Sequence, residues 1–113
     1  MIKIEAYIRP EKLEDVNAIM DTFNLTGMSI LQVMGFGKQK GWKEIIRGTE
    51  VDFNFVQKIK LEIVLMDSQV DEVVGAITDA LCTGEFGDGK IFTYEVKDAI
   101  RIRTKEHGED AIK

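Results

Sequence analysis

The sequence predicts an α+β domain in which one strand–helix–strand unit occurs twice. Residues 2–5 (Ile-Lys-Ile-Glu) resemble residues 59–62 (Ile-Lys-Leu-Glu), and residues 13–16 resemble residues 70–73 at the same offset of 57. In both copies the spacing of apolar residues changes from a period of two to a period of 3.6, which indicates a strand followed by a helix. The 113 residues have room for one such domain, so we expect a single domain over 1–113.

The first element of each unit is predicted to be a half-buried strand. Apolar residues occupy alternate positions, which places them on one face of a strand. They are Ile2, Ile4, Ala6 and Ile8 in the first unit, and Ile59, Leu61, Ile63 and Leu65 in the second.

Each strand is followed by a predicted amphipathic helix, because its apolar residues recur at helical spacing. They are Leu13, Val16, Met20 and Phe23 in the first unit, and Val70, Val73, Val74, Ile77 and Leu81 in the second. Pro10 suits the first helical position of the first helix, and Ser68 is the expected N-cap of the second.

A further strand closes each unit, over residues 29–35 and 90–96. The result is a ferredoxin-like double βαβ sandwich, with an antiparallel sheet and both helices on one of its faces. The other face must be solvated or covered by a partner, so we expect a homo-oligomer. That face is predicted to carry Tyr7, Gln32, Glu62 and Val64.

A polar stretch at about 37–57 separates the two units, and its length favours a functional loop. Trp42 and several basic residues in it have no evident core role. The alternative is an irregular hairpin, because Val51, Phe53 and Phe55 alternate with polar residues.

Composition excludes several classes of protein. A net charge of −5 argues against a general nucleic-acid binder. The chain has no apolar run near the roughly 20 residues that span a bilayer and no signal-peptide pattern at its start, so we expect a cytoplasmic protein without intrinsic membrane insertion. Cys82 is the single cysteine and His107 the single histidine, so no ligand set for structural zinc exists; Cys82 is expected in the core.

Residues 83–90 (Thr-Gly-Glu-Phe-Gly-Asp-Gly-Lys) are a candidate anion site. Their three glycines permit positive φ, and successive N–H groups can form a concave nest for phosphate oxygens, with Lys90 as the countercharge. Arg101 and Arg103 follow further along the chain. The segment is not a P-loop, because Ile91 stands where Ser or Thr is required. An ordinary Asp-Gly turn without a ligand is the alternative.

The chain resembles the PII signal-transduction proteins over essentially its whole length. The resemblance lies in residues 3–13, 35–41 (Gly-Phe-Gly-Lys-Gln-Lys-Gly), 47–48 (Arg-Gly), 83–92 and 100–104 (Ile-Arg-Ile-Arg-Thr). It implies a homotrimer that binds ATP or ADP in the clefts between subunits, with 2-oxoglutarate beside ATP through Mg²⁺. It also implies a regulator rather than an enzyme, with a T-loop at about 37–57, a B-loop at about 83–90 and a C-terminal loop at about 101–113.

The resemblance implies site residues for each ligand. For the nucleotide they are Met28, Ser29, Gly35, Gly37, Lys38, Gln39, Glu62, Val64, Gly87, Asp88, Gly89, Lys90, Arg101 and Arg103. For 2-oxoglutarate they are Phe36, Gly37, Gln39, Lys58 and Gly87, and Gln39 also faces Mg²⁺. Without the resemblance, a solvated lysine at a strand end is the alternative for Lys58.

Target proteins would be bound by Trp42, Arg47 and Gly48 in the T-loop. An ammonium transporter of the membrane is the leading target, because an extended Arg47 at the loop tip can enter its cytoplasmic mouth; glutamine synthetase or a transcription regulator are the alternatives. Peripheral membrane association would follow from binding a transporter.

The chain departs from the family pattern at several positions. Tyr7, Ser29 and Lys38 stand where an aliphatic residue, Thr and Arg are usual. Val51 stands where many members of the family carry a tyrosine that is switched by nucleotidylation, and Ile46 stands where the other common loop tyrosine occurs. Val and Ile lack the phenolic oxygen that this modification requires, so we expect signalling by ligand occupancy alone. Two other classes remain open: a small enzyme, for which no nucleophile and base pair is evident, and a trimeric structural or metal-tolerance module without nucleotide affinity.

Overall fold

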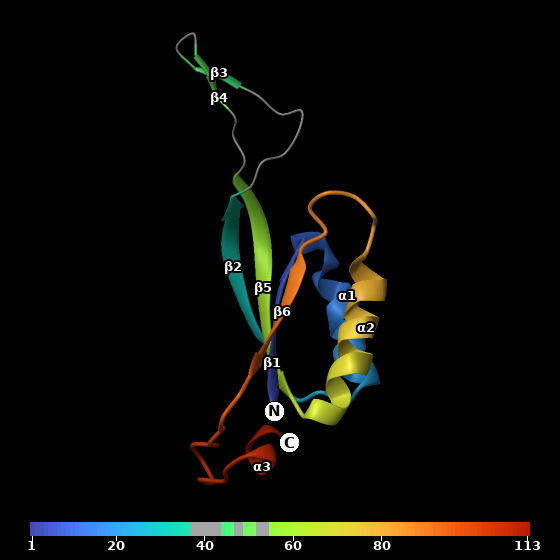
Figure 1. The fold of residues 1–113 in the computed structure, drawn as a ribbon, viewed down its shortest axis with the longest axis vertical. Coiled ribbons are helices and arrows are strands. Elements are labelled where there is room, and N and C mark those ends of the chain that lie inside the picture. Colours follow the sequence, from blue (N-terminus) through green and yellow to red (C-terminus); the bar gives the residue numbers. More distant parts are fainter. Residues whose placement is uncertain (37–43, 47–48, 52–54) are drawn as a thin grey trace.

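A computed structural model of the protein describes residues 1–36, 44–46, 49–51 and 55–113 (Figure 1). This part of the chain forms a four-stranded antiparallel sheet in the order β2-β5-β1-β6, with α1 and α2 on one face. The strands are β1 (Ile2–Ile8), β2 (Ser29–Phe36), β5 (Phe55–Leu65) and β6 (Lys90–Glu95). The helices are α1 (Leu13–Thr22), α2 (Val70–Leu81) and α3 (Glu109–Ile112). The ferredoxin-like α+β fold is therefore confirmed.

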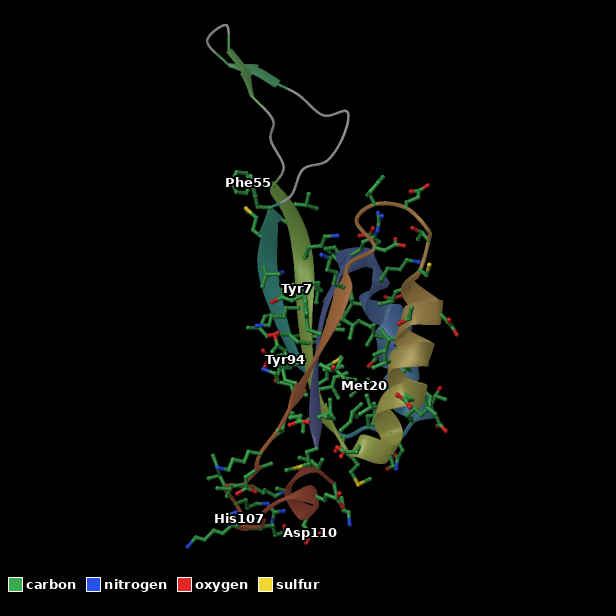
Figure 2. The ribbon with its side chains drawn as sticks, viewed as in Figure 1. Tyr7, Met20, Phe55, Tyr94, His107 and Asp110 are labelled. Atoms are coloured by element: carbon green, nitrogen blue, oxygen red, sulfur yellow. The ribbon has the colours of Figure 1, made fainter. Side chains whose placement is uncertain are left out.

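The core lies between the sheet and the two long helices, as the two periodicities predict. Most of the alternating positions of β1 and β5 and of the helical positions of α1 and α2 are buried in it, and Ile4, Val16, Val73 and Ile77 are fully inaccessible to solvent. Leu13, Phe23, Val70 and Val74 are partly buried and pack against this core. Figure 2 shows Met20 in this layer, between α1 and the sheet. Burying one such side chain stabilises the fold by about 1.5–3 kcal/mol.

Both helices begin with a single 3₁₀ turn, over Pro10–Lys12 and Asp67–Gln69. Pro10 opens its turn as expected. The prediction for Ser68 is wrong, because Ser68 lies inside the second turn. The side-chain oxygen of Gln69 caps this turn by accepting a hydrogen bond from the Met66 N–H at 3.3 Å.

Cys82 is also not where the sequence places it. It is the C-cap residue of α2 and is exposed. The apolar stripe of α2 ends one residue earlier, at the buried Leu81.

The open face of the sheet follows from the strand register. Tyr7 pairs with Lys60, Lys3 with Val64, and Ser29 with Glu62, so these side chains lie on the face away from the helices. Tyr7, Glu62 and Val64 are on this face as expected. Gln32 is not, because it pairs with Ile59, which faces the helices. It is nevertheless exposed, because β2 is an edge strand.

Between the repeats, β3 (Glu44–Ile46) and β4 (Thr49–Val51) pair antiparallel, with Glu44 opposite Val51. This short pair agrees with the hairpin alternative in this stretch, while Phe53 lies outside the described residues. Phe55 opposes Phe36 in the main sheet. The sheet therefore begins inside the range expected for the loop.

Candidate functional site

Asp88 fixes the conformation of the glycine-rich segment 83–90. Its carboxylate accepts hydrogen bonds from the Thr83 N–H at 2.8 Å, the Gly84 N–H at 3.0 Å and the Thr83 hydroxyl. These bonds, led by the one from the Thr83 side chain, hold the pKa of Asp88 below its usual value. A carboxylate repels an anion and only accepts hydrogen bonds, so Asp88 can bind an anion through its main-chain N–H alone.

Gly87 and Gly89 give the segment its shape. Their φ angles are +98° and +106°, a region that residues with a side chain rarely adopt. Such a backbone can turn its N–H groups toward an anion, as the nest interpretation requires. Lys90 follows directly as the first residue of β6, with its side chain exposed.

Two cations lie against this loop. The Lys58 ammonium donates to the carbonyl oxygen of Gly87, and the Arg9 guanidinium donates to that of Phe86 at 2.9 Å. Burial, and secondly the charge of Arg9, lower the pKa of Lys58. A groove of about 370 Å³ lies beside them, lined also by Val56. The structure therefore brings Lys58 and Gly87 together, as the 2-oxoglutarate prediction requires.

Arg9 is not among the site residues that the sequence predicts. The signal available was its position between the end of β1 and Pro10, at the same end of the sheet as the glycine-rich loop. The Arg9 Nε is buried and has no hydrogen-bond partner among the described residues. Arg9 also lies 3.5 Å from the Asp88 carboxylate, so it links the loop to the helix start.

A second group of predicted residues lines one pocket at the other end of the sheet. The pocket has a volume of about 790 Å³. Five residues expected around the nucleotide contribute to its wall: Met28, Ser29, Glu62, Val64 and Arg101. Part of the same wall comes from the C-terminal residues 111–113.

Arg101 makes two side-chain bonds within the C-terminal segment. Its Nη1 donates to the Glu106 carboxylate at 2.8 Å, and its Nη2 donates to the main-chain oxygen of Lys113 at 2.6 Å. Arg103 lies two residues further on, exposed in the turn that follows.

One chain does not bring the two groups together. Ser29 pairs with Glu62 near one end of the sheet, whereas Gly35 pairs with Val56 near the other. Gly35 lies six positions after Ser29 along β2, a distance of about 20 Å. Figure 1 shows the C-terminal segment and the loop after α2 at these opposite ends.

The open face between the two groups carries a charged and aromatic network. Glu5 is 7% exposed, and its carboxylate lies 2.7 Å from the Lys60 ammonium, which also contacts Glu62 at 3.2 Å. The bond from Lys60 lowers the pKa of Glu5, and a hydrogen bond to Glu5 raises the pKa of Tyr94. Tyr94 and Tyr7 both lie along this sheet in Figure 2.

Tyr7 packs against a second aromatic ring of the open face. It meets Phe92 edge to face, with ring centroids 6.0 Å apart. Tyr7, which stands where the family usually has an aliphatic residue, thus adds a second aromatic ring to this face. The two rings lie next to Lys90, which is opposite Tyr7 in the register of β1 and β6.

Six predicted residues lie outside the described part of the chain: Gly37, Lys38, Gln39, Trp42, Arg47 and Gly48. In the part that is described, no helix is long and apolar enough to span a membrane.

Comparison with known proteins agrees with the resemblance noted in the sequence. The family model described as "Nitrogen regulatory protein P-II" matches residues 1–106. The chain is 51% identical to the nitrogen regulatory protein P-II of Pasteurella multocida over 112 residues, which is 99% of this chain and 100% of that protein. With the same coverage, identity is 46% to the protein of Rhodospirillum rubrum and 49% to that of Nostoc punctiforme. The chain belongs to the nitrogen regulatory protein P-II family.

Proposed function

We propose that this P-II protein is a sensor of nitrogen, carbon and energy status that binds ATP or ADP together with 2-oxoglutarate. It regulates target proteins through the loop at about 37–57. One observation carries the proposal: the residues expected around the nucleotide form two half-sites at opposite ends of the sheet, so the ligand needs two copies of the chain.

A homotrimer joins the half-sites. When the glycine-rich loop of one copy faces the pocket of the next, the contact uses two different surfaces, and such contacts form a ring when the rotation between copies closes, as it does for three copies related by a threefold axis. Three copies would give three equivalent sites. The open sheet face supports this assembly, because Phe92 and Tyr94 are large side chains left 44% and 45% exposed on it.

The nucleotide would span the junction. Gly87, Gly89 and Lys90 of one copy would hold phosphate oxygens through N–H groups and an ammonium, and Arg101 and Arg103 of the next copy would add guanidinium groups. The adenosine would lie in the pocket of that second copy. Gly35, Gly37 and Lys38 of the first copy would complete the cleft.

2-Oxoglutarate would lie beside the nucleotide, at the groove near Gly87. Its two carboxylates suit the paired cations there, and we add Arg9 to Lys58 on the strength of their shared contacts with the loop. Mg²⁺ is commonly held by few protein groups together with substrate phosphates. Gln39 would supply the protein ligand, with Phe36 at the edge of the site.

Isothermal calorimetry and light scattering test this function. We expect a trimer that binds ATP or ADP, and that binds 2-oxoglutarate only when Mg²⁺ and ATP are present. Gln39→Ala and Lys58→Gln should weaken 2-oxoglutarate far more than ADP, whereas Lys97→Gln, a change at an exposed position outside both pockets, should alter neither. Tight 2-oxoglutarate binding to nucleotide-free protein would contradict the proposed order, and a monomer that binds ATP fully would contradict the composite site.

An ammonium transporter is the proposed target, since Arg47 and Gly48 keep the loop tip that fits its cytoplasmic mouth. The protein would then be cytoplasmic and peripherally associated with the membrane. Co-sedimentation with membranes that contain the transporter should be lost when ATP and 2-oxoglutarate are added. If Arg47→Ala leaves the association unchanged, the insertion is wrong, and glutamine synthetase or a transcription regulator becomes the next target to test.

A further inference from the structure

The guanidinium of Arg101 already has two oxygen partners in this chain. Nη1 is bonded to the Glu106 carboxylate and Nη2 to the main-chain oxygen of Lys113. These are the two nitrogens of the planar fork that an arginine uses to bind two phosphate oxygens. The same fork is a candidate phosphate ligand in the proposed nucleotide site.

Glu106 is held in place for this contact by a tight turn. The Arg101 N–H donates to the Glu106 carbonyl at 2.9 Å, and the Lys105 N–H donates to the Arg101 carbonyl at 2.7 Å. The Thr104 hydroxyl donates to the same carboxylate oxygen of Glu106 that Arg101 contacts. The ion pair is therefore part of an ordered turn and not a chance contact of two surface side chains.

The segment after the turn forms part of the pocket itself. Ala111 and Ile112, at the end of α3, line it together with Met28 and Val64. Lys113 both lines the pocket and supplies the second oxygen to Arg101. The bond to Arg101 and the wall of the pocket are thus made by one continuous piece of chain.

We propose that Glu106 and residues 109–113 compete with the nucleotide phosphates for Arg101, so that the C-terminal segment lowers nucleotide affinity and is released when nucleotide binds. This inference rests on the proposed function and adds a regulator to that same site.

Charge explains the direction of the effect. Phosphate groups that approach Arg101 meet a guanidinium neutralised by Glu106, and they are repelled by the Glu106 carboxylate itself. Removing that negative charge frees the fork and removes the repulsion. Because coupling between two binding events is reciprocal, nucleotide binding must weaken the contacts of the segment by the same factor that the segment weakens nucleotide binding.

Titration calorimetry of the full-length protein with ATP, ADP and adenosine tests the inference. Glu106→Gln should raise ATP affinity by about fivefold, in line with a partly exposed ion pair, and should leave adenosine affinity unchanged because adenosine carries no phosphate. Glu72→Gln is the matched control: it removes the same charge from an exposed position on α2 and should change neither affinity.

Amide hydrogen exchange of the unmodified protein gives an independent readout if the variant folds poorly. ATP should speed exchange at residues 105–113, whereas a segment that merely positions Arg101 would be slowed. Equal or weaker ATP binding by Glu106→Gln, or slower exchange with ATP, would overturn this inference alone. A wild-type protein that binds no nucleotide would overturn the proposed function, and this inference with it.

Discussion

Gly89 lies against the main chain of Tyr7 so closely that a Cβ on Gly89 would stand 1.8 Å from the Tyr7 carbonyl oxygen. No relaxation of a flexible side chain can remove this overlap, because both groups belong to the backbone. The contact joins the glycine-rich loop to β1, and it depends on a hydrogen atom at that position.

We therefore expect Gly89→Ala to destabilise the protein by at least about 3 kcal/mol, from backbone strain and the overlap together. Gly84→Ala is the matched control. Gly84 also has positive φ, at +82°, but a Cβ there meets nothing within 4 Å, so only strain of about 1–2 kcal/mol should appear. Urea denaturation of the two variants separates the effect of backbone strain from the effect of the overlap with Tyr7. Equal losses of stability in the two variants would show that the overlap with Tyr7 adds nothing.

The buried carboxylate of Glu5 should contribute to stability in a pH-dependent way. Its pKa is lowered in the folded protein, chiefly by Lys60. A group with a lowered folded pKa stabilises the fold above its unfolded pKa of about 4.3, and this contribution is lost as pH falls through the folded value.

Glu5→Gln should therefore flatten the loss of stability below about pH 4.3, while Lys60 keeps its contact with Glu62. Urea midpoints measured from neutral to acidic pH give the comparison. Glu14→Gln, on the exposed side of α1, should follow the wild-type curve. A Glu5→Gln curve parallel to wild type would contradict the role of this carboxylate.

Lys105 has a left-handed backbone conformation, with φ at +62°. A residue with a Cβ pays roughly 1–2 kcal/mol for this conformation, and glycine does not. Lys105→Gly should therefore stabilise the turn that holds Glu106 by about 1 kcal/mol.

Hydrogen exchange at the Glu106 and Gly108 N–H groups measures that turn directly. The comparison variant is Lys97→Gly, an exposed residue without positive φ; it should gain nothing, because glycine there only adds freedom to the unfolded chain. Faster exchange in Lys105→Gly than in wild type would show that the lysine side chain stabilises the turn.

The loop between the repeats should carry no nucleotidyl group. Val51, the last residue of β4, and Ile46 have no phenolic oxygen. The intact mass of protein from nitrogen-starved and ammonium-fed cells should therefore equal the mass of the unmodified chain. A nucleotidyl adduct in either sample would refute purely ligand-driven signalling, and a phosphate on Thr49 would add about −1.5 to −2 charge to the loop by a route we do not expect.

The sequence predicts the core residues more reliably than the residues at the helix ends. The alternation in β1 and the stripe in α2 are repeated signals over many residues, so single exceptions do not alter them. Ser68 and Cys82 are single positions near the ends of helices, where the chain has several geometries available. Gln32 was misplaced because its face depends on how β2 is registered against β5, and a shift of one residue reverses every side chain.

The candidate site likewise contains residues that the sequence predicts and residues that only the structure reveals. The glycines and cations of the loop were recognisable from residue type and order, because only certain residues permit positive φ or pair with an anion. Arg9 was not, since its position before Pro10 does not show that it contacts Phe86, 77 residues away.

The sequence by itself determined the repeated unit, the core and the family, because periodicity and motif order are local and numerous. Tertiary structure alone decided that Arg9 contacts Phe86 and that Arg101 is bonded to Glu106 and Lys113. Those facts depend on strand register and on the path of the C-terminal segment, which are set by packing and hydrogen bonds between residues far apart in the chain.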